Sequence, residues 1–150
     1  MKRDDLWEYL NSVNVLRLRY ERALAKCKSL REQCERMTQA LDGMPHSAEP
    51  GHQDAMLASL AQASIDADLC CANMRERKSE VEAFLERLEN PLYRTILQLR
   101  YVDNLRWPEV IERLEKATFA YSRTQVFRLH GDALVVARRL YDAERSEDDG

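Results

Sequence analysis

The sequence has few of the residues that end helices. Only four glycines and four prolines occur among its 150 residues, so most of the chain is free to stay helical. No apolar run approaches the roughly 20 residues that a membrane-spanning helix needs. The amino-terminal stretch is amphipathic and not continuously apolar, which argues against a secretory signal. We therefore expect an all-α protein that is cytoplasmic and makes no use of a membrane.

Residue groupings typical of enzymes and metal sites are also missing. The four cysteines, at positions 27, 34, 70 and 71, form no CxxC motif, and no HxxxH pair accompanies them, so a zinc site is poorly supported. No paired carboxylates stand at a catalytic spacing, and no glycine-rich phosphate loop occurs. We expect no enzymatic activity, no metal and no cofactor. The cysteines are expected to be reduced, small apolar residues of a helical core.

A seam of apolar and small residues runs through the first part of the chain, from about Asp4 to about Leu41. Its steps alternate between four and three residues, which predicts a long helix with a coiled-coil seam. The members of this seam are Tyr9, Val13, Leu16, Tyr20, Ala23, Cys27, Leu30, Cys34, Met37 and Leu41.

A second long helix is predicted from about Asp54 to Glu89, after a loop rich in proline and glycine at 42–53. Two helices of similar length joined by a short loop should form an antiparallel hairpin. Because such a hairpin buries only one stripe of each helix, we expect it to form a homodimer. The stripe of the second helix includes Met56, Leu57, Leu60, Ala63, Ala67, Cys70, Cys71, Met74, Val81, Phe84, Leu85 and Leu88.

Three short helices are predicted after the hairpin. Asn90 suits an N-cap and Pro91 a first helical position, Trp107 opens the next helix, and Ser122 caps the last one. Short helices joined by a turn match the helix-turn-helix plan. The expected domains are a helical hairpin at 1–89, a helix-turn-helix at 90–142 and an acidic tail at 143–150.

Positive charge is concentrated in this carboxyl-terminal third. The whole chain has a net charge of -3, but residues 90–141 hold nine basic and five acidic residues. Contacts with phosphate groups need such a local excess of positive charge. The last helix buries its aliphatic side and presents polar and basic residues near its start, types that suit base edges and phosphates. The candidate DNA-binding residues are Arg106, Ser122, Arg123, Thr124, Gln125 and Arg128.

The last predicted helix, SRTQVFRLHGDALVVAR, resembles the recognition helix of the fourth region of bacterial sigma factors. It shares a serine start at Ser122, aliphatic residues at Val126 and Leu129, and the pair Ala133-Leu134. The resemblance implies a helix that enters the major groove of double-stranded DNA, and it makes RNA polymerase a further candidate partner.

The chain more closely resembles uncharacterised phage and prophage proteins whose carboxyl-terminal half has the form LRYxxxxxWxEV…YSxxQVxRLHxxAL. Related phage proteins of the ArpU and RinA type are linked to control of late-gene transcription, so the resemblance implies a phage or prophage transcription regulator. The link at 115–120 is longer than is usual there, and we expect it to alter how the recognition helix docks. The matching positions are Leu99-Arg100-Tyr101, Trp107, Glu109-Val110, Tyr121-Ser122, Gln125-Val126, Arg128-Leu129-His130 and Ala133-Leu134.

Two other functions fit the same pattern. Small terminase-like subunits of phage DNA packaging also combine a helix-turn-helix with an oligomerising helical part. A polymerase-binding interaction module would use the carboxyl-terminal helices without binding DNA. Within those helices, Trp107 is expected to be a packing anchor that closes the turn, and His130 to make either a phosphate contact or a structural hydrogen bond.

Overall fold

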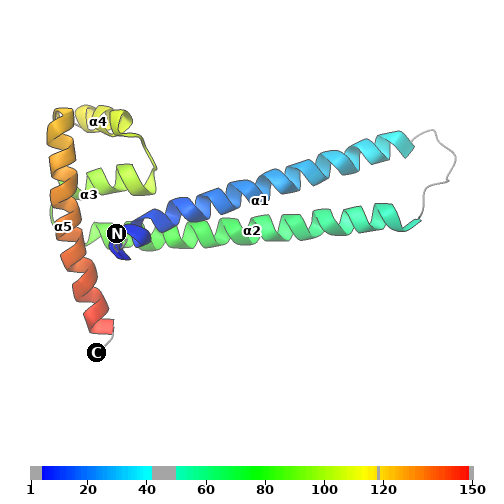
Figure 1. Cartoon of the computed structure of the whole chain (residues 1–150), viewed down its shortest axis with the longest axis horizontal. Helices are drawn as coiled ribbons and strands as arrows, with labels where there is room; N and C mark the ends of the chain where they lie inside the picture. The colour runs from blue at the N-terminus through cyan, green and yellow to red at the C-terminus, as the bar shows by residue number, and fades with distance from the viewer. Residues whose placement is uncertain (1–4, 42–49, 118, 149–150) are drawn as a thin grey trace. The chain divides into compact units, whose positions relative to one another are not determined.

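The computed structural model describes residues 5–41, 50–117 and 119–148, which form helices and no strand. This confirms the expected all-α fold class. The elements in chain order are α1 (Asp5–Leu41), α2 (Pro50–Glu86), α3 (Pro91–Leu97), the π-helix η1 (Gln98–Val102), α4 (Trp107–Lys116) and α5 (Arg123–Asp148). Figure 1 labels the five α-helices.

The chain forms two compact units. The hairpin unit comprises residues 15–75, and the core unit comprises residues 1–14 and 76–150. Both units take residues from α1 and α2, so they cut across the segments 1–89, 90–142 and 143–150 that the sequence indicated. Whether those segments fold separately stays a prediction.

In the hairpin unit, a segment of α1 pairs with a segment of α2 in antiparallel fashion. Cys34 Sγ lies 4.0 Å from the carbonyl oxygen of Met56, whereas Tyr20 interacts with Cys71. An earlier α1 residue therefore faces a later α2 residue, as an antiparallel pair requires. The predicted α1 seam is correct here, because its members from Leu16 to Met37 are all buried or half-buried.

The predicted α2 stripe is wrong at one residue, Leu57. Leu57 is 51% exposed, whereas its neighbours Met56 and Leu60 are half-buried. Adjacent residues of a helix point about 100° apart, so Leu57 falls outside the stripe that Met56 and Leu60 occupy.

The core unit has a first hydrophobic cluster that joins the start of α1 and the end of α2 to the carboxyl-terminal helices. Ala133 and Ala137 of α5 are fully buried in it, and their small side chains allow a close approach of helix backbones. α2 ends at Glu86, earlier than expected, and the chain then turns to bury Leu88. The buried members are Leu6, Leu10, Val13, Val81, Phe84, Leu85, Leu88, Leu97, Tyr101, Val102, Ala133 and Ala137.

A second cluster holds α3, α4 and α5 together. Its centre consists of four fully buried aliphatic side chains, Ile96 from α3, Val110 and Leu114 from α4, and Val126 from α5. Each of the three helices buries its apolar face against the other two. The cluster fixes the start of α5 against α4.

Local signals define the helix starts as the sequence predicted. The Asn90 side chain accepts hydrogen bonds from the backbone amides of Leu92 and Tyr93, and Pro91 is the first residue of α3. The π-helix then ends with the amide of Asp103 donating to the carbonyl of Gln98. Asn104, with φ of 55°, reverses the chain before α4, and asparagine tolerates this left-handed conformation better than most residues.

The last helix is longer than the sequence indicated. α5 continues to Asp148 and so includes most of the predicted acidic tail. Near that end, Arg87 Nη2 donates to Glu144 Oε2 over 2.9 Å.

Of the helices in the described part of the chain, none is both long and apolar enough to cross a membrane.

Candidate nucleic-acid interface

The six residues predicted to bind DNA are all exposed. Arg106 directly precedes α4, and the other five lie at the start of α5. Trp107, the neighbour of Arg106, contacts Phe127 on the second turn of α5. The structure therefore brings the beginnings of α4 and α5 together, with their polar residues on the surface.

Ser122 and Gln125 bond to each other across the first turn of α5. The Ser122 hydroxyl accepts from the amide of Gln125 over 3.2 Å, and the Gln125 side-chain oxygen accepts from the amide of Ser122 over 2.9 Å. This reciprocal arrangement is a capping box, which satisfies two amides that a helix start leaves free. It confirms Ser122 as a cap and reduces the freedom of Gln125 to read a base.

Arg123 lies over the ring of Phe127. Its guanidinium carbon is 5.3 Å from the ring centroid, within the range of a cation–π interaction. Phe127 is 39% exposed. Arg123 was predicted from the sequence as a DNA-binding residue and Phe127 was not, although the spacing of four residues places both on one helix face.

Four aromatic rings form a chain of contacts behind this pair, which we call the aromatic ladder (Tyr101, Trp107, Phe127 and His130). The Phe127 ring meets Trp107 edge-on at 5.0 Å, and Trp107 meets His130 at 4.7 Å. His130 in turn stacks on Tyr101 at 5.8 Å and shares a hydrogen bond of 2.9 Å with its hydroxyl. Edge-on and stacked pairs of this kind stabilise a fixed geometry.

Arg100 of η1 lies over one ring of the ladder. Its guanidinium carbon lies 4.8 Å from the centroid of the Trp107 ring, and its Nη1 donates to the carbonyl of Leu105 over 2.9 Å. The turn between η1 and α4 is thereby tied to the same rings. This agrees with the predicted role of Trp107 as an anchor that closes the turn.

His130 makes a structural hydrogen bond, one of the two roles that the sequence allowed. Burial, with a smaller effect of the Arg100 cation, lowers the pKa of His130 from 6.5 to about 4. The imidazole is therefore neutral at pH 7 and brings no positive charge toward a phosphate. The same burial raises the pKa of Tyr101.

The link between α4 and α5 is packed into the second cluster. The amide of Phe119 donates to the carbonyl of Leu114 over 2.7 Å, and the side chains of Phe119 and Tyr121 pack against the second cluster. Thr118 lies outside the described residues. The length of the link therefore does not leave the start of α5 unsupported, and its effect on docking stays a prediction.

The basic residues at this surface lack acidic partners. Within the described ranges, no carboxylate forms an ion pair with Arg106, Arg123 or Arg128, whereas several basic residues elsewhere in the core unit do have such partners. The pairs are Lys116 with Glu112, Arg94 with Glu86, Arg87 with Glu144 and Arg145 with Asp5. The positive charge at the start of α5 is thus available to an anionic partner.

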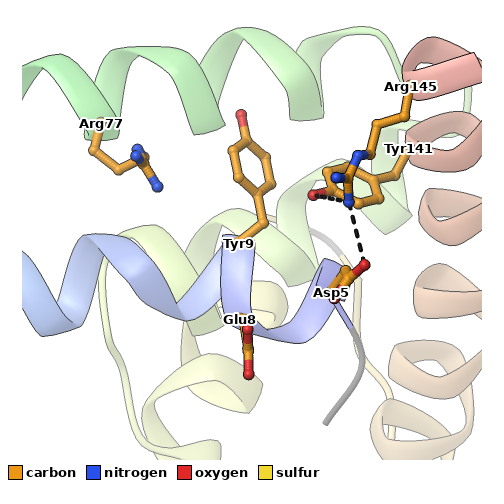
Figure 2. A pocket seen from close by; sticks show the side chains of 6 residues that line it. All are labelled: Asp5, Glu8, Tyr9, Arg77, Tyr141 and Arg145. Atoms are coloured by element: carbon orange, nitrogen blue, oxygen red, sulfur yellow. Dashed lines mark hydrogen bonds and ion pairs between the residues drawn. The ribbon is translucent and has the colours of Figure 1, made fainter. Parts of the chain in front are cut away.

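A shallow hollow elsewhere in the core unit holds two more arginines, as Figure 2 shows. Arg145 lies over the Tyr141 ring and pairs with Asp5 at 3.2 Å. Arg77 pairs with Glu80 at 3.3 Å. Because both cations have acidic partners already, this hollow is a weaker candidate for an anion site than the start of α5. No group of metal-binding side chains occurs among the residues that the structure describes.

A family model with the description "Protein of unknown function (DUF1492)" matches residues 49–134, more than half of the chain. The matched region includes α2, α3, η1, α4 and the start of α5, and so contains the whole aromatic ladder. No curated protein and no solved structure matches the chain.

Proposed function

The chain belongs to the DUF1492 family, and within it we propose that this protein is a sequence-specific DNA-binding transcription regulator of phage or prophage origin. α4, the link and α5 would act as a helix-turn-helix, with the first turns of α5 in the major groove of double-stranded DNA. The protein would work in the cytoplasm, without enzymatic activity of its own.

A single observation supports this proposal best: the two faces of α5 differ in polarity near its start. Val126 is fully buried among α3 and α4, whereas Arg123, Thr124 and Arg128 are exposed and the two arginines have no acidic partner among the described residues. A helix held by its aliphatic side, with free cations on the other side, suits a groove lined by phosphates. The positive end of the helix dipole adds to the attraction.

The resemblance of this segment to sigma factor region 4 and to ArpU and RinA proteins supports transcription as the process. RNA polymerase would then be a second partner, as in proteins that bind DNA and polymerase through the same kind of helices. A genomic setting among phage packaging and portal genes is the expected finding for a phage regulator.

The hairpin unit would join two copies into a homodimer. Leu18 is 66% exposed, and Ile65 and Leu69 are each 60% exposed. Ile65 and Leu69 lie one turn apart on α2, and Leu18 lies on α1. Large apolar side chains with such exposure favour a protein interface. A dimer would present two reading helices to two half-sites, which is the usual arrangement for this type of DNA recognition.

A different observation favours a second function, docking to a protein without DNA binding. Phe127, Val135 and Val136 are 39%, 47% and 37% exposed along α5, and apolar residues of this size suit a protein partner. In this alternative the same helix would contact polymerase directly. DNA binding that weakens steeply with salt would be absent.

Gel retardation on the DNA upstream of the protein's own gene tests the proposed function. We expect the double variant Arg123→Ala/Arg128→Ala to bind at least about tenfold more weakly, because each arginine contributes a charge-assisted contact. The control is Arg22→Ala/Arg36→Ala, which removes the same charge from exposed positions of the hairpin unit and should bind as the wild type does. Equal retardation by both double variants would reject the start of α5 as the DNA-binding surface.

A further inference from the structure

Arg123 and Arg128 differ in how firmly the protein holds their side chains. The Arg123 guanidinium rests on the Phe127 ring at 5.3 Å. Arg128 is exposed and has neither a ring nor a carboxylate partner among the described residues. A guanidinium that is already oriented loses less conformational entropy when it forms two hydrogen bonds at once. Arg123 is therefore the better placed of the two for a contact with demanding geometry.

Phe127 is itself held in place by residues far from it in the sequence. Its ring stands perpendicular to Trp107, and Arg100 covers Trp107 at 4.8 Å. Arg100 also bonds to the carbonyl of Leu105, in the turn before α4. The position of the Arg123 side chain thus depends on η1, on the turn and on α4, and not on α5 alone.

The exposure of this pair leaves it open to a partner. Phe127 is only partly covered, with 39% of its surface exposed, and Arg123 is exposed. The planar donors of an arginine match the O6 and N7 acceptors of guanine in the major groove, the commonest base-specific contact of proteins with DNA. Phosphate contacts, in contrast, tolerate mobile cations and provide no sequence information.

From these contacts, and resting on the proposed DNA binding, we infer that Arg123 determines specificity by recognising a guanine, that Phe127 positions it, and that Arg128 contacts the phosphate backbone. Arg123 and Arg128 thereby have separate roles within one helical turn and a half. Arg123 sets which sequence is bound, and Arg128 contributes to affinity for any duplex.

Selection from a pool of random DNA duplexes tests this assignment. The wild-type protein should select a consensus that contains a guanine at a defined position. Arg123→Lys keeps the charge but not the planar fork, so we expect it to lose about 5- to 150-fold of the preference for that guanine while it keeps its affinity for unrelated duplexes. Arg128→Lys is the matched control and should keep the preference.

Variants of Phe127 test the positioning role. Phe127→Leu retains an apolar side chain against Trp107 but removes the ring, so the preference for guanine should fall in the same direction as in Arg123→Lys. Phe127→Tyr retains the ring and should restore the preference. Circular dichroism and the unfolding temperature of each variant show whether the fold is intact, and the tyrosine variant gives a result even if the leucine variant does not fold.

The possible results distinguish a failure of the guanine assignment from a failure of the proposed DNA binding. If the wild type selects a consensus and Arg123→Lys selects the same guanine with equal strength, the assignment is wrong although DNA binding stands. If Arg128→Lys loses the preference and Arg123→Lys keeps it, the assignment is also wrong. If the wild type retains no duplex at all, the proposed function itself fails, and the assignment fails with it.

Discussion

The ionisation of His130 responds strongly to the packing of the core unit. Burial, and to a lesser extent Arg100, lowers its pKa to about 4, whereas in the unfolded chain it regains a value near 6.5. Between these two values the unfolded state binds a proton that the folded state does not. The stabilisation is complete above pH 6.5 and is lost as the pH falls toward 4, by about 3 kcal/mol at most.

Urea unfolding at several pH values between 7.5 and 4.5 measures this loss. We expect His130→Gln to show a weaker fall in the free energy of unfolding over that range than the wild type. His52→Gln is the control, since His52 is exposed, and it should follow the wild-type curve. Equal pH dependence in wild type and His130→Gln would contradict the buried, neutral imidazole.

At the scale of single elements, α5 contains a glycine that its own fold does not require. Gly131 lies within the helix, and a Cβ atom there would meet nothing within 4 Å. Glycine in a helix interior costs about 0.5–1 kcal/mol relative to alanine. Gly131→Ala should therefore raise the free energy of unfolding by about that amount, as measured by urea denaturation. A loss of stability would contradict the open space around Gly131.

Element boundaries could be predicted where the signals are local. Asn90-Pro91 and Ser122 start α3 and α5 as expected, because capping depends on residues only two or three positions away. The π-helix and the aromatic ladder could not be predicted in this way. Phe127 has no local signal of its role, since its contact with Trp107 joins residues on different helices.

At the scale of the whole molecule, the homodimer proposed above depends on the surface of the hairpin unit. Replacing both Ile65 and Leu69 with glutamate places charge on a surface that a homodimer would bury. We expect light scattering to show a dimer for the wild type and a monomer for Ile65→Glu/Leu69→Glu, with unchanged helix content. A larger ring in the wild type would favour a DNA-packaging role instead, and a wild-type monomer would contradict the expected dimer.

Hydrophobic periodicity along the sequence predicts helices but not the contacts between distant parts of the chain. The heptad seam predicted α1 correctly, because a seam depends only on spacing along one helix. It gave no sign that Leu6 and Leu10 pack with Ala133 and Ala137, since contacts between the ends of a chain leave no periodic pattern. The two compact units therefore have other boundaries than the segments predicted from the sequence.

α5 is one uninterrupted helix of 26 residues, a rod of about 39 Å at 1.5 Å per residue. Its first turn presents Arg123, and its last turns contact Tyr9 and Asp5 at the start of α1. In an uninterrupted helix, the side chains at the two ends keep a fixed angle to each other about the helix axis. Each inserted residue would turn one end by about 100° relative to the other, so the spacing between Arg123 and Tyr141 sets the direction in which the turn that holds Arg123 faces.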